Sequence, residues 1–109
     1  MYEFGSIILV PFPFTDLTAT KVRPALIVSQ PDPAARDVIV CFITSNVKPG
    51  SPHSLPLKRT ATSGLKVPSL VRFDKIATLD RRIILGELGR INPRVLREHR
   101  RTFFAVFGF

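Results

Sequence analysis

Short apolar segments alternate with proline- and glycine-containing turns along most of the chain, and this pattern predicts strands. Residues 7–10, 25–28 and 38–43 are continuous apolar runs rich in β-branched side chains. The run at residues 25–28 is typical of a strand that is buried on both faces. A turn signal at residues 31–33 separates the second run from the third, which predicts a hairpin.

The second half of the chain predicts further strands of a different kind. Residues 67–73 and 75–79 alternate between apolar and polar positions, as strands with one covered face do. Residues 55–57 predict an edge strand, because Pro56 cannot donate a hydrogen bond to a ladder. Residues 83–86 predict another strand, which residues 87–91 continue.

Prolines mark the end of the first predicted strand and the start of a predicted helix. Pro11 and Pro13 are expected to end the pairing of the first strand. Asn92 followed by Pro93 predicts the start of a helix, and Gly108 stands where that helix would stop. Apolar and basic residues recur at helical spacing between Asn92 and Gly108. Many short strands followed by one closing helix predict a single domain over residues 1–109, a small and strongly bent β-barrel or sandwich.

Composition adds a strong basic bias to this picture. The 109 residues include 16 Lys and Arg against 8 Asp and Glu, a formal charge of +8. This charge favours polyanionic partners, although basic proteins are too common for charge alone to indicate nucleic-acid binding. No apolar run has the length of a membrane span, and the start lacks the basic segment of a signal peptide, so we expect a cytoplasmic protein without membrane contact. The single cysteine, Cys41, lies in an apolar run and is expected to be a buried small hydrophobe.

Arg23 and Thr44 are the candidate pair for chemistry. Pro24 stands at the mouth of a buried strand and biases Arg23 toward an extended backbone, which would hold the guanidinium at the rim of the core. An Arg that merely extends over the barrel edge is the structural alternative. The predicted hairpin would bring Arg23 near Thr44, at the end of the next strand. For Thr44 the alternative is a strand-end hydroxyl that satisfies backbone groups.

Several blocks in order resemble the MazF/PemK-type toxins of bacterial type II toxin–antitoxin systems. They comprise residues 5–16, 21–26, 43–45, 71–80 and 85–91. The resemblance implies a mainly β, SH3-like barrel with a C-terminal helix (MazF/CcdB-like). It also implies a homodimer and a cofactor-free, metal-independent endoribonuclease that cleaves single-stranded RNA in a sequence-selective way. Ser6 departs from the pattern, because family members often carry an acidic residue at that position.

The resemblance also implies the catalytic roles, which map onto Arg23 and Thr44. RNA supplies its own nucleophile, the 2′-hydroxyl, so the protein must stabilise the oxyanionic phosphorane. Arg23 offers a planar fork of donors for that charge, and Thr44 offers a hydroxyl that can orient a phosphate oxygen. The products would be a 2′,3′-cyclic phosphate and a 5′-hydroxyl. A guanidinium is a poor base, so the group that transfers the proton stays open.

Other polar residues are weaker candidates. Substrate-binding residues along the same rim are expected to be Thr15, Thr18, Thr20, Lys21 and Ser45. His53 matches no motif and is expected to be a solvated loop residue. Asp16 and Asp74 lack partners at metal-ligand spacing, so we expect no metal site. The expected helix carries a basic face, which is either solvated or contacts RNA or an acidic partner: Arg94, Arg97, Arg100 and Arg101.

Two other functional classes remain open on the same barrel. One is a non-catalytic toxin that binds a protein target such as DNA gyrase, and the other is a plain RNA-binding barrel. The presence of both Arg23 and Thr44 favours the enzyme, because a binding module has no need of that pair. The partners implied by the resemblance are single-stranded RNA and a cognate antitoxin with an acidic C-terminal tail.

Overall fold

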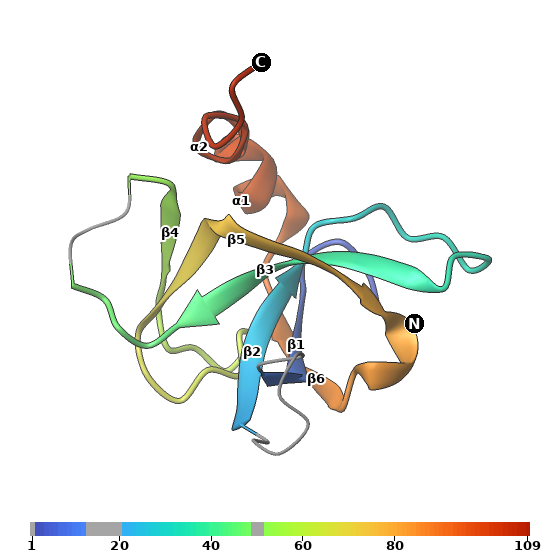
Figure 1. Ribbon diagram of the computed structural model, residues 1–109. Coiled ribbons are helices and arrows are strands. Elements are labelled where there is room, and N and C mark those ends of the chain that lie inside the picture. The colour runs from blue at the N-terminus through green and yellow to red at the C-terminus, as the bar shows by residue number, and fades with distance from the viewer. Residues whose placement is uncertain (1, 13–20, 49–51) are drawn as a thin grey trace.

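The sheet of this protein contains six antiparallel strands in the order β4-β5-β3-β2-β1-β6 within the described residues. The structure is a computed structural model that describes residues 2–12, 21–48 and 52–109. Two short C-terminal helices and one 3₁₀ turn complete it (Figure 1). The elements are β1 (Ser6–Phe12), β2 (Lys21–Ile27), β3 (Asp37–Thr44), β4 (Ser54–Leu57), β5 (Ser69–Asp80), η1 (Arg81–Ile83), β6 (Gly86–Arg90), α1 (Pro93–Glu98) and α2 (Arg100–Phe104).

A register shift between β3 and β5 bends this sheet sharply. Cys41 pairs with Ile76, but Ile43 pairs with Val71, so residues 72–75 of β5 stand against the single residue Phe42 of β3. Extra residues on one strand of an antiparallel pair increase its local twist and curvature. The sheet therefore curls into a half-barrel, and the C-terminal helices lie over one end of it (Figure 1). This confirms the strongly bent β architecture predicted from the sequence.

The second half of β2 is buried on both faces, as its unbroken apolar run predicted. Leu26 belongs to one core cluster with Ile7 and Cys41, whereas Ala25 belongs to a second cluster with Ile8. All five side chains have 0% exposure. Full burial of an aliphatic side chain such as Leu26 stabilises a fold by about 1.5–3 kcal/mol. The backbone of β2 is thus fixed up to the point where Arg23 emerges from the core.

Cys41 is a core residue, as expected. Its burial raises the pKa of the thiol to about 12, and the nearby carboxylate of Asp74 contributes in the same direction. The thiol therefore stays protonated at neutral pH. A protonated, enclosed thiol is a poor nucleophile, and the role of Cys41 is packing.

Pro11 does not end the first strand, contrary to the prediction. β1 continues through Phe12, with Pro11 paired to Val22 and Phe12 paired to Lys21. The neighbouring strand β6 pairs with β1 only as far as Leu9, so from Val10 onward β1 has an open edge. Proline is tolerated at such an edge. Pro13 lies outside the described residues. The longer strand carries Phe12 up to the rim of the barrel.

The strand expected over residues 83–86 is also wrong in its first half. Residues 81–83 form η1, because the Asp80 carboxylate accepts a hydrogen bond of 2.8 Å from the backbone N–H of Arg82 and caps the turn. β6 begins only at Gly86. The two strands expected over residues 67–73 and 75–79 form one continuous strand, β5, which begins at Ser69.

The predicted helix starts where expected but is broken in two. The Asn92 side chain accepts a hydrogen bond of 2.9 Å from the backbone N–H of Arg94, and Pro93 is the first helical residue. His99 leaves helical geometry, with φ −102° and ψ 14°, and separates α1 from α2. No helix in the described part of the chain is long and apolar enough to cross a membrane.

Candidate active site

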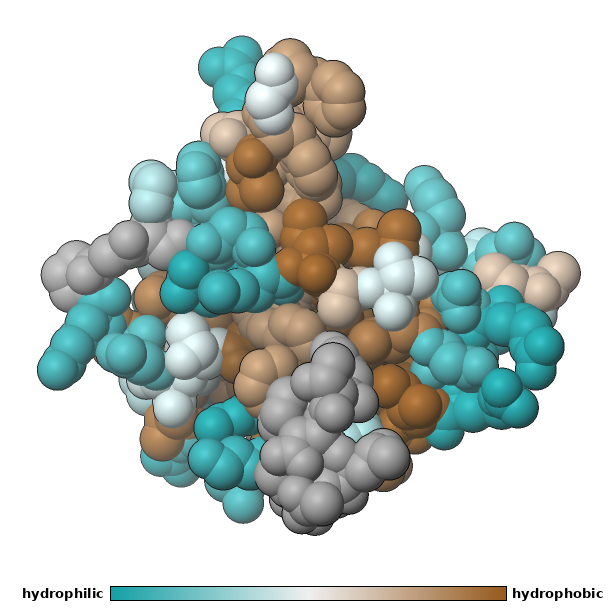
Figure 2. Space-filling model, viewed as in Figure 1, coloured by the Kyte–Doolittle hydropathy of each residue, from teal (hydrophilic) through white to brown (hydrophobic). Residues whose placement is uncertain are grey.

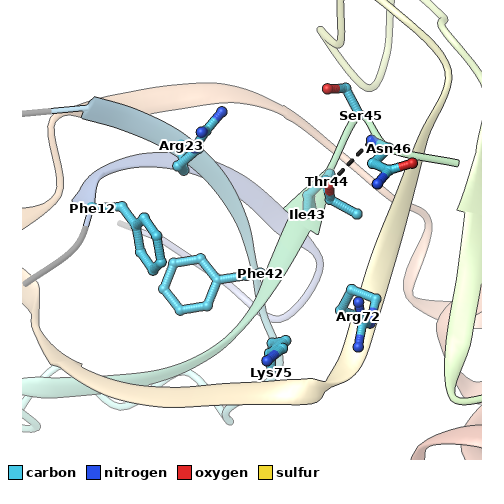
Figure 3. Close-up of a pocket in the computed structure, with 9 residues that line it drawn as sticks. All are labelled: Phe12, Arg23, Phe42, Ile43, Thr44, Ser45, Asn46, Arg72 and Lys75. Carbon is cyan, nitrogen blue, oxygen red and sulfur yellow. Dashed lines mark hydrogen bonds between the residues drawn. The ribbon is translucent and has the colours of Figure 1, made fainter. Parts of the chain in front are cut away.

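A pocket of about 460 Å³ opens where β1 ends, β2 begins and β3 ends (Figure 3). The strands β1, β2, β3 and β5 all contribute to it. It contains both members of the pair predicted from the sequence, and Ser45 beside them. The lining residues are Phe12, Arg23, Phe42, Ile43, Thr44, Ser45, Asn46, Arg72 and Lys75.

Arg23 is held at the rim of this pocket by the ladder on one side and the core on the other. Its backbone pairs with Val10 of β1, and two residues later Ala25 is fully buried. The Arg23 side chain is exposed, and no carboxylate of the described residues lies within ion-pair distance of it. A guanidinium in this position has its donors available for an anion in the pocket.

Thr44 has a structural contact and a free donor. Its Oγ1 accepts a hydrogen bond of 3.1 Å from the backbone N–H of Asn46, which stabilises the turn that follows β3 (Figure 3). This is the backbone role considered for Thr44 from the sequence. A hydroxyl that accepts one bond still has its own hydrogen to donate. Thr44 can therefore hold the turn and donate to a phosphate oxygen at the same time.

Arg72 and Lys75 are pocket residues that were not selected from the sequence. Arg72 forms a bidentate contact with Asp74, with Nε 2.8 Å from Oδ1 and Nη2 2.7 Å from Oδ2. The hydrogen bonds from Arg72 hold the pKa of the Asp74 carboxyl below its usual range and raise the pKa of Arg72. Both groups are therefore charged at neutral pH, and the fork-to-fork geometry fixes the orientation of Arg72.

The bend in the sheet brings Arg72 and Lys75 to the pocket. Both belong to residues 72–75, the segment of β5 that stands against Phe42 alone. One sequence signal could have identified them as site candidates: both lie inside the block 71–80, which carries part of the family resemblance. The alternation of β5 puts Arg72 on the face opposite the buried Val71 and Phe73.

The pocket combines positive charge with an aromatic wall. Arg23, Arg72 and Lys75 supply three cationic side chains, and the Asp74 charge is already paired with Arg72. The rings of Phe12 and Phe42 lie 5.3 Å apart at 59° and form the apolar side (Figure 3). Cationic side chains beside aromatic rings suit a phosphodiester with its attached base.

A second pocket of about 320 Å³ shares Arg23, Ile43 and Ser45 with the first. Its other lining residues come mainly from β1, β6 and the loop before β5: Leu9, Pro24, Gly64, Leu65, Lys66, Val67, Ser69 and Leu88. Arg23 thus stands between two adjoining hollows. A ligand longer than one nucleotide could extend from one hollow to the other past this side chain.

The remaining candidates from the sequence either fall outside the described residues or do not line this pocket. Thr15, Thr18, Thr20 and Asp16 fall outside the described residues. Lys21 is exposed at the start of β2 and pairs with Phe12, one step from the pocket lining. His53 precedes β4, is half-buried rather than fully solvated, and does not line the pocket. In the described part of the chain, no three His, Cys, Asp or Glu side chains are grouped so as to hold a metal ion.

The fold and this pocket together define a small basic β-barrel with a candidate anion-binding site at the open end of its central strands. The family model described as PemK-like, MazF-like toxin of type II toxin-antitoxin system matches residues 3–107. The chain therefore belongs to the PemK-like, MazF-like toxins. No curated protein sequence matches it at a significant level.

Solved structures show the same fold. An endoribonuclease in complex with its cognate antitoxin from Mycobacterial species superimposes with a TM-score of 0.79 at 18% identity, covering 100% of this chain and 97% of that chain. The Mycobacterium tuberculosis toxin MazF-mt6 gives 0.76 at 23% identity, with coverage of 94% and 95%. A MazE–MazF structure from Deinococcus radiodurans gives 0.73 at 25% identity, with coverage of 99% and 97%. The expected MazF-like barrel is confirmed.

Proposed function

We propose that this toxin is a metal-independent endoribonuclease that cleaves single-stranded RNA to 2′,3′-cyclic phosphate and 5′-hydroxyl ends. The observation that carries the proposal is the presence of Arg23 and Thr44 in one pocket. The names of relatives with this fold, among them endoribonucleases, support the same activity. A non-catalytic toxin or an RNA-binding module would not require a free guanidinium beside a hydroxyl at a strand end.

In the proposed reaction the 2′-oxygen attacks the adjacent phosphorus. The O2′–P bond forms and the P–O5′ bond breaks, while one proton leaves the 2′-oxygen and one reaches the 5′-oxygen. Arg23 donates to the non-bridging oxygens as negative charge develops on them, and Thr44 donates its free hydroxyl hydrogen to a phosphate oxygen. Arg72 and Lys75 hold the phosphates on either side.

RNA would enter through the two hollows that meet at Arg23. Phe12 and Phe42 offer an aromatic surface to a base on one side, and stacking of this kind tolerates many sequences. Thr15, Thr18, Thr20, Lys21 and Ser45 are further proposed contacts along the rim. Base selectivity would come from the shape and the donors of the second hollow, where Lys66 and Ser69 stand among apolar side chains.

We further propose a homodimer formed through the apolar face beside the second hollow. Leu85 is 60% exposed and Val67 is 48% exposed, and the backbone N–H of Leu85 donates to the carbonyl of Leu9, which lines that hollow. Exposed apolar side chains gathered at one place favour an isologous contact. A dimer formed here would carry the RNA groove from one protomer to its partner.

The regulator in this proposal is a cognate antitoxin with an acidic C-terminal tail, and the site of action is the cytoplasm. Structures with related folds have been solved with an antitoxin bound. The formal charge of +8 suits an acidic partner that competes with RNA for the cationic groove.

Incubation of the purified protein with a long single-stranded RNA in EDTA tests the proposed activity. Endonucleolytic products with 5′-hydroxyl ends and cyclic phosphates are expected. Intact RNA, with or without stable binding, would favour a non-catalytic toxin or a binding module. Products that appear only when a divalent metal is added would contradict the metal-independent mechanism.

A further inference from the structure

The pocket that contains Arg23 and Thr44 offers a ligand many hydrogen-bond donors and few acceptors. Arg23, Arg72 and Lys75 line it and carry donors only. Both oxygens of the nearby Asp74 carboxylate already accept from Arg72. Figure 2 shows hydrophilic residues beside apolar ones over this end of the sheet, where β2 begins and β3 ends. An RNA base that enters the pocket therefore meets side chains that donate.

Two acceptors of the lining are already engaged by the backbone of the turn after β3. Oγ1 of Thr44 accepts from the Asn46 N–H at 3.1 Å, and Oδ1 of Asn46 accepts from the Lys48 N–H at 3.3 Å. Among the described side chains of the lining, the Ser45 hydroxyl is the remaining acceptor, and it also lines the second hollow. A base edge that consists of acceptors suits this wall, whereas an amino group finds few partners on it.

The contact with Lys48 fixes which end of the Asn46 amide faces the backbone. Only the oxygen of an amide accepts from an N–H, so Oδ1 lies at the turn and Nδ2 carries the two donors. Figure 3 shows Nδ2 on the side of Thr44, with Oδ1 turned away from it. Asn46 is exposed and lines the pocket, so a ligand can reach these donors.

We propose that Asn46 selects guanine over adenine at a nucleotide next to the scissile phosphate. This inference rests on the endoribonuclease function proposed above. The base would lie against the rings of Phe12 and Phe42, and Nδ2 of Asn46 would donate to O6 of guanine. Adenine carries an amino group at the same ring position, and a donor that faces a donor is unfavourable. This choice of base adds to the selectivity proposed for the second hollow and is separate from the phosphate contacts of the cationic side chains.

The aromatic wall and the donors together favour guanine among the four bases. The rings of Phe12 and Phe42, 5.3 Å apart at 59°, form a stacking surface, and a purine has a larger π face for it than a pyrimidine has. Guanine presents N7 beside O6, so the edge that faces the donors consists of two acceptors. Adenine stacks equally well but offers only N7 on that edge.

The test starts from the cleavage sites mapped on a long single-stranded RNA in EDTA. Guanine is expected on one side of the scissile phosphate. Short RNAs with the mapped sequence then carry guanosine, inosine or adenosine at this position, and kcat/KM is measured for each. Inosine keeps O6 and lacks only the 2-amino group, so it should be cleaved nearly as fast as guanosine. Adenosine should be cleaved about tenfold more slowly.

Asn46→Asp is the test variant, because it replaces the amide donors and keeps an oxygen for the Lys48 N–H. It should erase or reverse the preference for guanosine over adenosine. Val47→Asp is the matched control, since it adds the same charge at a residue that is 50% exposed and does not line the pocket. The control should keep the preference, even where its charge slows cleavage of every substrate. A disturbed turn would also slow all substrates alike, so the ratio of the two rates is the readout.

Any of three results would overturn the inference: mapped sites without guanine on either side of the scissile phosphate, inosine cleaved as slowly as adenosine, or an unchanged preference in Asn46→Asp. Absence of cleavage by the unaltered protein would instead contradict the proposed function. In that case the affinities of two uncleavable 2′-deoxy strands, which differ only by hypoxanthine in place of adenine, decide the inference. The hypoxanthine strand should bind about tenfold more tightly, and equal binding would count against the role of Asn46.

Discussion

Arg23 and Thr44 stand at matching positions on two neighbouring strands, each two residues beyond the last pair of the β2–β3 ladder. That last pair is Ala25 with Phe42, and the strands continue past it to Arg23 on one side and Thr44 on the other. Both side chains then line the same pocket. The open end of a hairpin thus places a cation and a hydroxyl together, while most of the paired residues below them stay buried.

Thr44→Val is expected to slow RNA cleavage about tenfold, because it removes one hydrogen bond to a charged phosphate oxygen. It also removes the acceptor for the Asn46 N–H, so the turn after β3 would lose a contact. Thr44→Ser keeps both the donor and the acceptor and is the matched control. Single-turnover cleavage of one labelled RNA by the two variants makes the comparison. Equal cleavage rates for Thr44→Val and the unaltered protein would show that Thr44 has a structural role only.

The 2′-hydroxyl of the cleaved nucleotide is the proposed nucleophile, and its replacement by hydrogen should abolish cleavage. Binding should survive, because phosphate contacts to Arg23, Arg72 and Lys75 do not depend on that group. The measurement pairs a cleavage assay with a binding assay on an RNA that carries one deoxynucleotide at the mapped site. Affinity for this uncleaved RNA should fall steeply as salt is added. Cleavage of the modified site at the original rate would require another nucleophile.

Leu85→Glu should convert the proposed dimer to monomers and reduce RNA cleavage with it. A charge in place of an exposed apolar side chain cannot be buried in an isologous contact without a large cost. Ile39→Glu is the control, since Ile39 is also exposed, at 41%, and does not line the hollow beside Leu85. Sedimentation at micromolar concentration measures the state of association. A monomeric variant with full activity would show that one protomer suffices.

Asp80→Asn removes the negative charge from the residue that caps η1. The hydrogen bond from Arg82 lowers the pKa of Asp80 from 3.8 to about 2 in the folded protein. The ionised carboxylate therefore stabilises the fold above about pH 4, and this contribution is lost as the pH falls toward 2. Asn still accepts from the Arg82 N–H but carries no charge. The Tm difference between the two proteins should be largest above pH 4 and disappear near pH 2. A difference independent of pH would exclude the charge as its cause.

The local part of the site could be predicted because it depends on one hairpin. Two apolar runs, a turn between them and Pro24 at the strand mouth were enough to place Arg23 near Thr44. The helix start at Asn92 was equally local, since one side chain caps it. Such features follow from neighbouring residues, which sequence patterns describe well.

The rest of the pocket depends on contacts between distant parts of the chain. Arg72 and Lys75 enter it because residues 72–75 bulge against Phe42, a register shift that alternation along β5 does not show. Phe12 reaches the rim because β6 stops pairing with β1 at Leu9, which leaves an edge where Pro11 is tolerated. The break of the helix at His99 was not predicted either, because the helical spacing of the apolar residues continues across it.

The cleavage rate of Arg23→Ala is the most direct test of the proposed mechanism. Loss of a donor aimed at developing charge costs about a hundredfold or more in rate, and an exposed Arg contributes little to the fold. Arg59→Ala, an exposed Arg in the loop after β4, is the matched control. In EDTA, with one single-stranded RNA, we predict unchanged cleavage by the control and a loss of at least about a hundredfold in Arg23→Ala, with the Tm retained. Cleavage by a folded Arg23→Ala at the rate of the unaltered protein would contradict the assignment.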